Sequence, residues 1–292
     1  MEIIVDNVQR LVDAEMHTVN SPGTQRIDWF LEYHQIEDIY DWLRQLAEKH
    51  ADILRVTAPG DLSKRKRIWL ESMVHAREWI SGITLQYIIN SLVGGYSRGE
   101  QRIKTLLEKA VFVFVPVCNP DGCLYGWRTD RMWRKNCEHT VSGKAYGVDL
   151  NRNWPDHWAS DGSSNDPGAE DFHGPSAGSS REVQALMAAY IKEPNVVGAI
   201  DFHAYSQLIL SPYGWTNAAS PDDAAYERIG QQIADDIYRQ SGKNYTFQRS
   251  ISLYPTSGTV SDWWYGPAVE AKIKAGIPGP RPYSFAMELR PN

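Results

Sequence analysis

The stretch Arg67–Glu78 reads RIWLESMVHARE and joins a strand pattern directly to a helix pattern. Arg67–Val74 is rich in bulky apolar residues, which is typical of a buried strand. From Glu78 to Val93 the apolar residues recur about every third or fourth position, which predicts a helix. A strand that leads straight into a helix is the repeating unit of α/β folds.

The same alternation continues along the chain. Further strands are predicted at Ala110–Val117, Val196–Phe202 and Tyr283–Leu289, and further helices at Ile36–Lys49, Ser180–Ile191 and Asp223–Tyr238. This order predicts an α/β fold with a mostly parallel central sheet flanked by helices. The stretch from Asn119 to Gly178 is rich in Gly, Asn, Asp and Ser and has little periodicity, so we expect a long functional loop there.

Composition excludes several classes of protein. Apolar residues make up 42% of the 292 positions, which is enough for a substantial core, and the net charge of −6 disfavours a nucleic-acid binder. No window approaches the roughly 18 apolar residues of a membrane span, so no membrane partner is expected. Three cysteines, Cys118, Cys123 and Cys137, could form at most one pair and do not predict a disulfide scaffold.

Three residues at predicted strand ends form a candidate metal site. His75 ends the first strand, Glu78 begins the next helix, and His203 directly follows Val196–Phe202. Sites in open α/β sheets gather at the carboxyl ends of strands. Two His and one Glu are a catalytic zinc set that leaves one coordination position for water. The alternatives are a helix-capping Glu78 and two ordinary hydrogen-bonded histidines.

Glu288 lies in the otherwise apolar strand SFAMEL, where a charge needs either a partner or a function. A hydrolytic zinc site needs a base for its water, and Glu288 is the candidate. The alternative is a salt bridge to Arg290.

Cationic and amide side chains in the loop region could bind a carboxylate. Arg131 and Arg134 are three residues apart, and Asn151 precedes Arg152. Arginine binds carboxylates through paired hydrogen bonds and can stabilise an oxyanion. Tyr254, in the turn-rich YPTSGT, could close over substrate. The alternatives are arginines stacked on tryptophan and ordinary packing of the tyrosine.

In order along the chain, these segments resemble the zinc metallocarboxypeptidases of the carboxypeptidase A/B family. The motifs between about Ile27 and Arg290 are HAREW, NPDG, RMWRK, VDLNRNW, FHAYSQ, PYG, YPTSG, DW and ELR. The resemblance implies a mixed sheet of eight strands flanked by helices and one Zn²⁺ ion. It also implies an exopeptidase that removes one residue at a time from the C-termini of peptides or proteins. The His₂Glu ligand set is a property of that family and is carried over as such.

Residue roles carried over from the family cover the whole candidate site. The metal ligands are His75, Glu78 and His203; Glu288 is the general base and Arg134 the oxyanion arginine; Asn151, Arg152 and Tyr254 bind the terminal carboxylate; Arg77, Arg131 and Tyr205 are secondary substrate contacts. The residue before the D-W pair, here Ser261, lies at the bottom of the family's side-chain pocket. Because Ser261 is not acidic, we expect a preference for apolar or aromatic C-terminal residues.

The resemblance also divides the chain. Residues 1–26 resemble the end of the family's inhibitory pro-segment, with Arg26 as a cleavage point, and residues 27–292 resemble the catalytic domain. By this analogy we expect a secreted zymogen that acts as a monomer. We expect two elements of the family to be missing. Only Val56–Lys66 stands where an edge hairpin is usual, and the chain stops at Asn292 before a C-terminal helix. Ala145 stands where the family's common disulfide would begin.

Three other interpretations stay open at this point. The chain could be a catalytically silent zinc-binding relative, a zinc amidase or deacylase on the same fold, or an unstable truncated form. Glu288, Arg134 and Tyr254 favour an active enzyme, because a silent relative has no chemical need for all three. The carboxylate-binding set favours a peptidase over an amidase.

Overall fold

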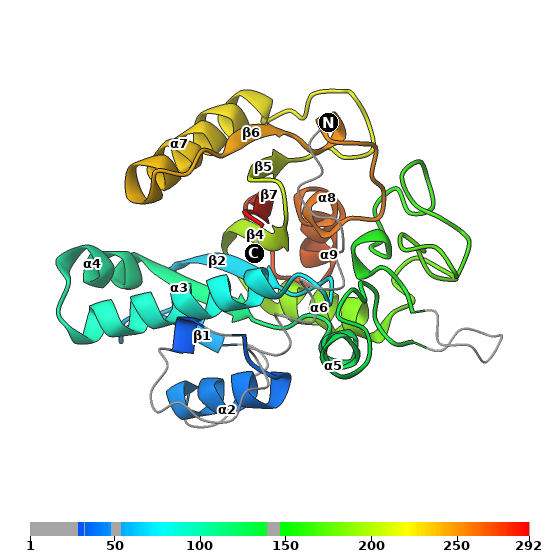
Figure 1. The fold of residues 1–292 in the computed structure, drawn as a ribbon. Coiled ribbons are helices and arrows are strands. Elements are labelled where there is room, and N and C mark those ends of the chain that lie inside the picture. The colour runs from blue at the N-terminus through cyan, green and yellow to red at the C-terminus, as the bar shows by residue number, and fades with distance from the viewer. Residues whose placement is uncertain (1–28, 32, 48–53, 139–146, 292) are drawn as a thin grey trace.

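The computed structural model describes residues 29–31, 33–47, 54–138 and 147–291. Its centre is a seven-stranded sheet in the order β1-β3-β2-β4-β7-β5-β6 (Figure 1). The strands are β1 (Leu54–Val56), β2 (Lys66–Ser72), β3 (Ala110–Val115), β4 (Val196–Ala204), β5 (Leu208–Ser211), β6 (Thr246–Arg249) and β7 (Tyr283–Leu289). The pairs β3/β2, β2/β4, β4/β7 and β5/β6 are parallel, and β1/β3 and β5/β7 are antiparallel. The predicted mixed, mostly parallel sheet is confirmed.

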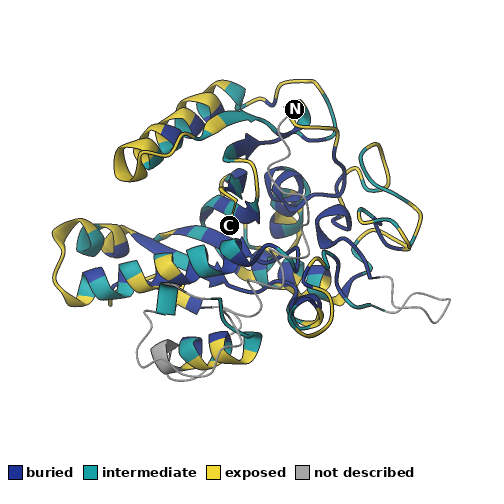
Figure 2. Cartoon of the chain, viewed as in Figure 1, coloured by how far each residue is buried: buried dark blue, intermediate teal, exposed yellow. Residues whose placement is uncertain are grey.

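Helices cover both faces of this sheet. They are α2 (Ile36–Ala47), α3 (Trp79–Ser97), α4 (Gln101–Lys109), α5 (Pro120–Arg128), α6 (Arg181–Lys192), α7 (Asp223–Ser241), α8 (Val260–Tyr265) and α9 (Pro267–Lys274). One hydrophobic cluster joins the sheet to α2, α3 and α7, and a second joins it to α6, α8 and α9. The outer surfaces of α4 and α7 are exposed, while the strands between the layers are buried (Figure 2).

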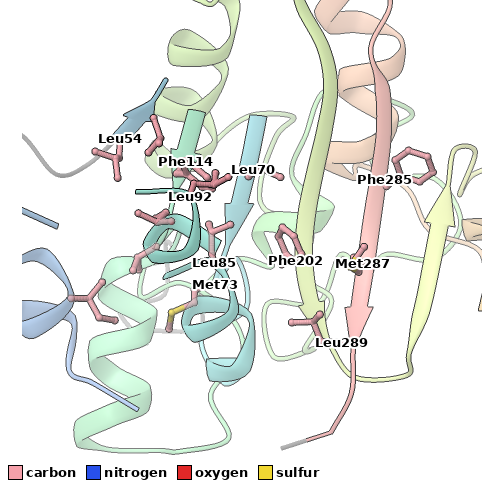
Figure 3. Close-up of a cluster of buried hydrophobic side chains, with 14 of the residues drawn as sticks. Leu54, Leu70, Met73, Leu85, Leu92, Phe114, Phe202, Phe285, Met287 and Leu289 are labelled. Atoms are coloured by element: carbon pink, nitrogen blue, oxygen red, sulfur yellow. The ribbon is translucent and has the colours of Figure 1, made fainter. Parts of the chain in front are cut away.

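Alternation along the central strands assigns their side chains to the two clusters. On β2, Leu70 packs in the first cluster and Trp69 in the second. Phe202, Phe285 and Met287 extend the first cluster across β4 and β7 (Figure 3). Residues of β4 and β7 that alternate with these three therefore point to the face of α6, α8 and α9. The candidate site is built on that second face, at the carboxyl ends of the strands.

Several predicted boundaries differ from the structure. The stretch 119–178 is not wholly a loop, because α5 lies inside it. Asn119 caps α5 through its side-chain oxygen and Pro120 occupies the first turn. Strands β5 and β6 and helices α4, α8 and α9 were not predicted. The resemblance implies eight strands, and the described residues form seven. At the edge where we expect the family's hairpin to be missing, the sheet has only the short strand β1.

Other expectations meet the structure only in part. Cys118, Cys123 and Cys137 are all free. Within the described residues, no helix is long and apolar enough to cross a membrane. The expected pro-segment at 1–26, the cleavage point Arg26 and the position Ala145 lie outside the described residues.

Candidate active site

Two adjacent strands bring His75, Glu78 and His203 together. β2 and β4 run parallel with Ser72 opposite Phe202. The chain leaves β2 through a turn that carries His75, and Glu78 is the residue that begins α3. His203 is the second-to-last residue of β4, so it lies inside the strand and not just after it as the sequence predicts. All three residues are buried, and their ligand atoms lie within 4.8 Å of one another.

Both imidazole rings turn Nδ1 toward Glu78, with their planes tilted by 44° to each other. Nδ1 of His75 lies 2.7 Å from one carboxylate oxygen of Glu78, and Nδ1 of His203 lies 3.1 Å from the other. The two Nδ1 atoms are 3.2 Å apart. The carboxylate of Glu78 makes no hydrogen bond to the first turn of α3, so the helix-capping alternative does not describe it. Two nitrogens and a carboxylate that converge on one point are donors suited to a zinc ion.

Asp149 organises the next layer of the site. One of its oxygens lies 3.1 Å from Nε2 of His75, and the other accepts hydrogen bonds of 3.1 and 2.8 Å from the Arg134 guanidinium. Burial would raise the pKa of Asp149, but Arg134 and His75 outweigh it and hold that pKa well below its usual range. Asp149 therefore stays ionised and fixes both a ligand and the predicted oxyanion arginine.

Glu288 stands directly beside the ligands. It is opposite His203 in the parallel ladder of β4 and β7, so both side chains point to the same face. Burial raises the pKa of Glu288, His203 opposes this rise, and Glu78 adds to it. Arg290 lies beyond the end of β7, where its backbone N–H donates to Tyr245. A carboxyl with a raised pKa beside a metal site has the properties of a general base.

A short 3-10 helix, η2 (Leu150–Arg152), presents the next two candidates. Asp149 caps it, accepting from the N–H of Asn151 at 2.9 Å. The Asn151 side chain accepts from the N–H of Val260 at 3.0 Å and its amide nitrogen lies 3.3 Å from Nε2 of His203. Arg152 donates to the carbonyl of Gly162 at 2.8 Å. Both residues are buried and held in place.

A cleft of about 690 Å³ opens above these residues, within the range usual for ligand sites. Its lining residues are Arg77, Arg134, Arg152, Asp161, Gly162, Glu170, Asp171, Tyr254 and Pro255. Three predicted arginines and the predicted tyrosine thus share one cavity. Tyr254 is 49% exposed, whereas Arg134 and Arg152 are largely covered. The cleft therefore combines three guanidinium groups, three carboxylates and an exposed phenol.

The family model that matches this chain is described as zinc carboxypeptidase and covers residues 46–292. The chain belongs to the zinc carboxypeptidase family. Zinc carboxypeptidase A 1 of Anopheles gambiae is 34% identical, over all of this chain and 67% of the relative. Carboxypeptidase O of Bos taurus is 32% identical, over 89% of this chain and 71% of the relative. Membership makes this chain a zinc-dependent metallocarboxypeptidase, a hydrolase that acts on peptide C-termini.

Solved structures agree with this assignment. The crystal structure of thrombin activatable fibrinolysis inhibitor superposes with a TM-score of 0.83 at 27% identity, over 98% of this chain and 73% of that one. Carboxypeptidase A from Helicoverpa armigera superposes with a TM-score of 0.80 at 25% identity, with the same coverage. The fold expected from the resemblance is therefore confirmed.

The remaining predicted residues of this carboxypeptidase lie at different depths. Arg77 lines the cleft and pairs with Glu170 at 2.9 Å. Arg131 is buried, stacks 3.7 Å above the ring of Trp79 and donates to the carbonyl of Arg77. Tyr205 is 69% exposed. Ser261 is buried 3.5 Å from the Thr259 hydroxyl. Arg131, Tyr205 and Ser261 are not among the described cleft-lining residues, and their substrate roles stay predictions.

Two buried aspartates of the site escaped the sequence prediction. Asp149 was quoted within a motif without a role, and Asp201 was read as part of an apolar strand. Each carried a signal: Asp149 stands between Val148 and Leu150, and Asp201 shares a strand face with His203 two positions later. A lone acid in an apolar run beside a ligand is the pattern that could have found both.

Proposed function

We propose that this carboxypeptidase removes single C-terminal residues with apolar or aromatic side chains, using Glu288 as its base. The observation that carries the proposal is the register of β4 and β7, which sets Glu288 directly opposite the ligand His203. His75, Glu78 and His203 would hold the ion. Bound zinc lowers the pKa of water and polarises a carbonyl. The chain's own residues supply the proton transfers and the orientation.

Proton transfer is assigned to Glu288. Its carboxylate takes a proton from the attacking water and later gives that proton to the leaving amine. Burial raises the pKa of Glu288, which makes its carboxylate a better proton acceptor than an exposed glutamate. Arg134 is fixed by Asp149 with part of its guanidinium open to the cleft, so it can donate to the developing oxyanion.

Recognition of the free C-terminus is assigned to Asn151, Arg152 and Tyr254. Arg152 and Tyr254 line the same cleft, and Asn151 precedes Arg152 in η2. A guanidinium and two neutral donors suit a carboxylate. At the bottom of the family's side-chain pocket stands Ser261, whose hydroxyl lies 3.5 Å from that of Thr259. Neither residue is charged, so an apolar side chain is not penalised there and a basic one gains no partner from them.

Peptide trimming tests this function. Peptides blocked at the N-terminus and ending in Phe, Leu or Lys are incubated with the purified chain, with zinc and with a zinc chelator. We expect release of Phe and Leu to exceed release of Lys, loss of all release with the chelator, and recovery on adding zinc. A faster release of Lys contradicts the proposed preference.

A C-terminally amidated Phe peptide is the matched control. It keeps the side chain and removes the carboxylate that Arg152 and Tyr254 would bind. We expect its hydrolysis to fall at least about a hundredfold, as for an anion that loses a charged partner. Equal turnover of acid and amide would favour an amidase and contradict the exopeptidase assignment.

We also propose, by family analogy, that residues 1–26 are the end of a pro-segment, that cleavage near Arg26 precedes full activity, and that the protein is a secreted monomer. Limited tryptic digestion followed by mass spectrometry tests the cleavage point. Activity that is unchanged, or lost, after removal of residues 1–26 would contradict an inhibitory role for that segment.

A further inference from the structure

The outer nitrogen of His203 contacts a carboxylate that no part of the proposed mechanism uses. Nε2 of His203 lies in short hydrogen-bond contact with Asp201. Nδ1 of the same ring faces Glu78, on the side of the ligand set. An imidazole that binds a metal through one nitrogen carries its proton on the other. In the zinc-loaded protein, Nε2–H of His203 therefore donates to Asp201.

The backbone holds Asp201 rigidly in this position. Asp201 precedes His203 by two residues on β4, so both side chains leave the same face of the strand. β4 lies between β2 and β7, and Asp201 is paired in register with Glu71 on one side and Ala286 on the other. Asp201 is fully buried, and a ligand supported from a central strand is held more accurately than one supported from a loop.

Asn151 also approaches Nε2 of His203, at 3.3 Å through its amide nitrogen. An amide nitrogen donates and cannot accept a proton from the ring. Among the hydrogen bonds of the described residues, Asp201 is the acceptor available to this N–H. The two contacts favour opposite tautomers, and metal binding through Nδ1 selects the one that uses Asp201.

We infer that Asp201 is a positioning residue for the zinc ligand His203, holding its ring in the tautomer and orientation that place Nδ1 toward the ion. This inference rests on the zinc site of the proposed function. It makes Asp201 the counterpart of Asp149, which contacts Nε2 of the other ligand, His75. Carboxylates behind ligating histidines fix the ring and raise its basicity toward the metal.

Glu71 supports the same arrangement from the neighbouring strand. It is fully buried, lies opposite Asp201, and accepts from the Trp69 indole at 2.7 Å through one oxygen. The other oxygen of Glu71 and the second oxygen of Asp201 are buried without a hydrogen-bond partner in the described structure. Burial, and next the charge of Asp201, raise the pKa of Glu71 well above its usual range. Glu71 lies directly behind Asp201, on the side away from β7, and packs against that carboxylate from the neighbouring strand.

Zinc affinity of an Asp201→Asn variant tests the inference. The zinc dissociation constant is measured by competition with a chromophoric chelator, and the absorption spectrum of the Co²⁺-substituted protein reports ligand geometry. We expect zinc binding to weaken about 10- to 100-fold and the Co²⁺ bands to shift, as when other carboxylates behind metal ligands are removed. A zinc affinity within twofold of the parent with an unchanged Co²⁺ spectrum overturns the inference.

Two control variants separate this role from others. Glu288→Gln removes the proposed base, which is not a metal ligand, and should keep zinc affinity within about twofold. Glu71→Gln keeps the size of the side chain behind Asp201 and leaves the Asp201–His203 contact intact, so it should also keep zinc affinity within about twofold. A loss of more than tenfold in Glu71→Gln would show that the support of His203 does not come from Asp201 alone.

Thermal unfolding of the metal-free proteins shows whether a loss of zinc affinity merely reflects a loss of fold. Asp201→Asn keeps the size and most of the hydrogen-bonding capacity of the buried side chain, so metal-free Asp201→Asn should still unfold in one cooperative transition at a temperature near that of the parent. If Asp201→Asn does not fold, Asp201→Ser repeats the zinc and Co²⁺ measurements with a smaller neutral acceptor, and parent-like values there overturn the inference. Peptidase activity is followed in parallel. If the parent chain binds zinc but releases no amino acids, the proposed function is refuted. The zinc affinities of the parent and of Asp201→Asn would still test the role of Asp201.

Discussion

Two buried aspartates show how differently the metal side and the pocket side of this site treat charge. Asp149, behind the ligands, meets the Arg134 guanidinium and His75, which hold its pKa well below the usual range in spite of burial. Asp262, in the segment Thr256–Asp262 that carries Ser261, is equally buried and accepts from the N–H of Gly214 at 2.9 Å. Burial, reinforced by Asp156, raises the pKa of Asp262 to about 7.

This difference in pKa indicates what kind of group each region can bind. On the metal side, Arg134 and His75 keep Asp149 ionised and fixed, which suits an arginine that must not move. Beside Ser261, burial keeps Asp262 neutral at acidic pH, which fits the proposed preference for uncharged side chains. The same residue type thus serves opposite purposes because its neighbours differ.

The largest effect expected on the metal side comes from Glu288→Gln. The amide cannot accept a proton from water, so kcat/KM should fall about 10³-fold, within the range for general acid–base groups. Hydrolysis of the blocked Phe peptide and zinc content per molecule are measured together. Retained zinc with activity within tenfold of the parent would show that Glu288 is not the base.

Arg134→Ala should lower kcat about 10²- to 10³-fold, because one donor to the oxyanion is lost. It also leaves Asp149 buried without its cationic partner, so the unfolding temperature should fall. Arg77→Ala is the matched control, since Arg77 lines the same cleft but is 31% exposed and pairs with the more exposed Glu170. Its effect on a short peptide should stay within about threefold. Equal losses of kcat in the two variants would contradict the proposal that Arg134, unlike Arg77, donates to the oxyanion.

The stability of an Asp262→Asn variant tests whether Asp262 keeps its proton in the folded protein. With its pKa raised from 3.8 to about 7, folded Asp262 keeps a proton that the unfolded chain releases. Its contribution is therefore fully present below pH 3.8 and is lost as pH rises toward about 7, by about 1.4 kcal/mol per pH unit at most. Between pH 5 and 7 the variant should gain about 2 kcal/mol relative to the parent. Urea unfolding at both pH values measures this, and a pH-independent difference would mean that Asp262 is ionised throughout.

The smallest expected effect is that of Tyr254→Phe. The ring is kept and one hydroxyl is lost from a half-exposed side chain, so kcat/KM for the acid-terminated peptide should fall about tenfold. The amidated peptide should lose nothing further, because it has no carboxylate for the hydroxyl to bind. An equal loss on both peptides would place Tyr254 elsewhere in the reaction.

Much of the fold could be predicted from local pattern. β2, β3, β4 and β7 are central strands whose continuous apolar runs are visible in sequence, because a mostly parallel sheet is buried on both faces. β5 and β6 are only four residues long, and their pairing with β7 and with each other is a long-range matter. Helix α5 was missed because Gly122 and Gly126 weaken its helical pattern, although Asn119 and Pro120 mark its start.

The candidate site divides in the same way. His75, Glu78, His203 and Glu288 stand at strand ends or in an apolar strand, where chemistry is conspicuous in sequence. The contact of Asp201 with His203 can be predicted only once His203 is known to lie inside β4, two residues after Asp201 on the same face of the strand. Arg131 was expected at the cleft, yet it stacks on Trp79 below the surface. Spacing along the chain does not report the depth of a side chain.

The sequence by itself indicated the candidate metal ligands, the candidate base and the alternation of strands and helices, because residue type and short-range periodicity carry that information. The tertiary structure alone decided which carboxylates are ionised. Asp149 and Asp262 are the same residue in similarly buried places, and the neighbours that folding brings to each, Arg134 and His75 beside Asp149 and Asp156 near Asp262, shift their pKa values in opposite directions.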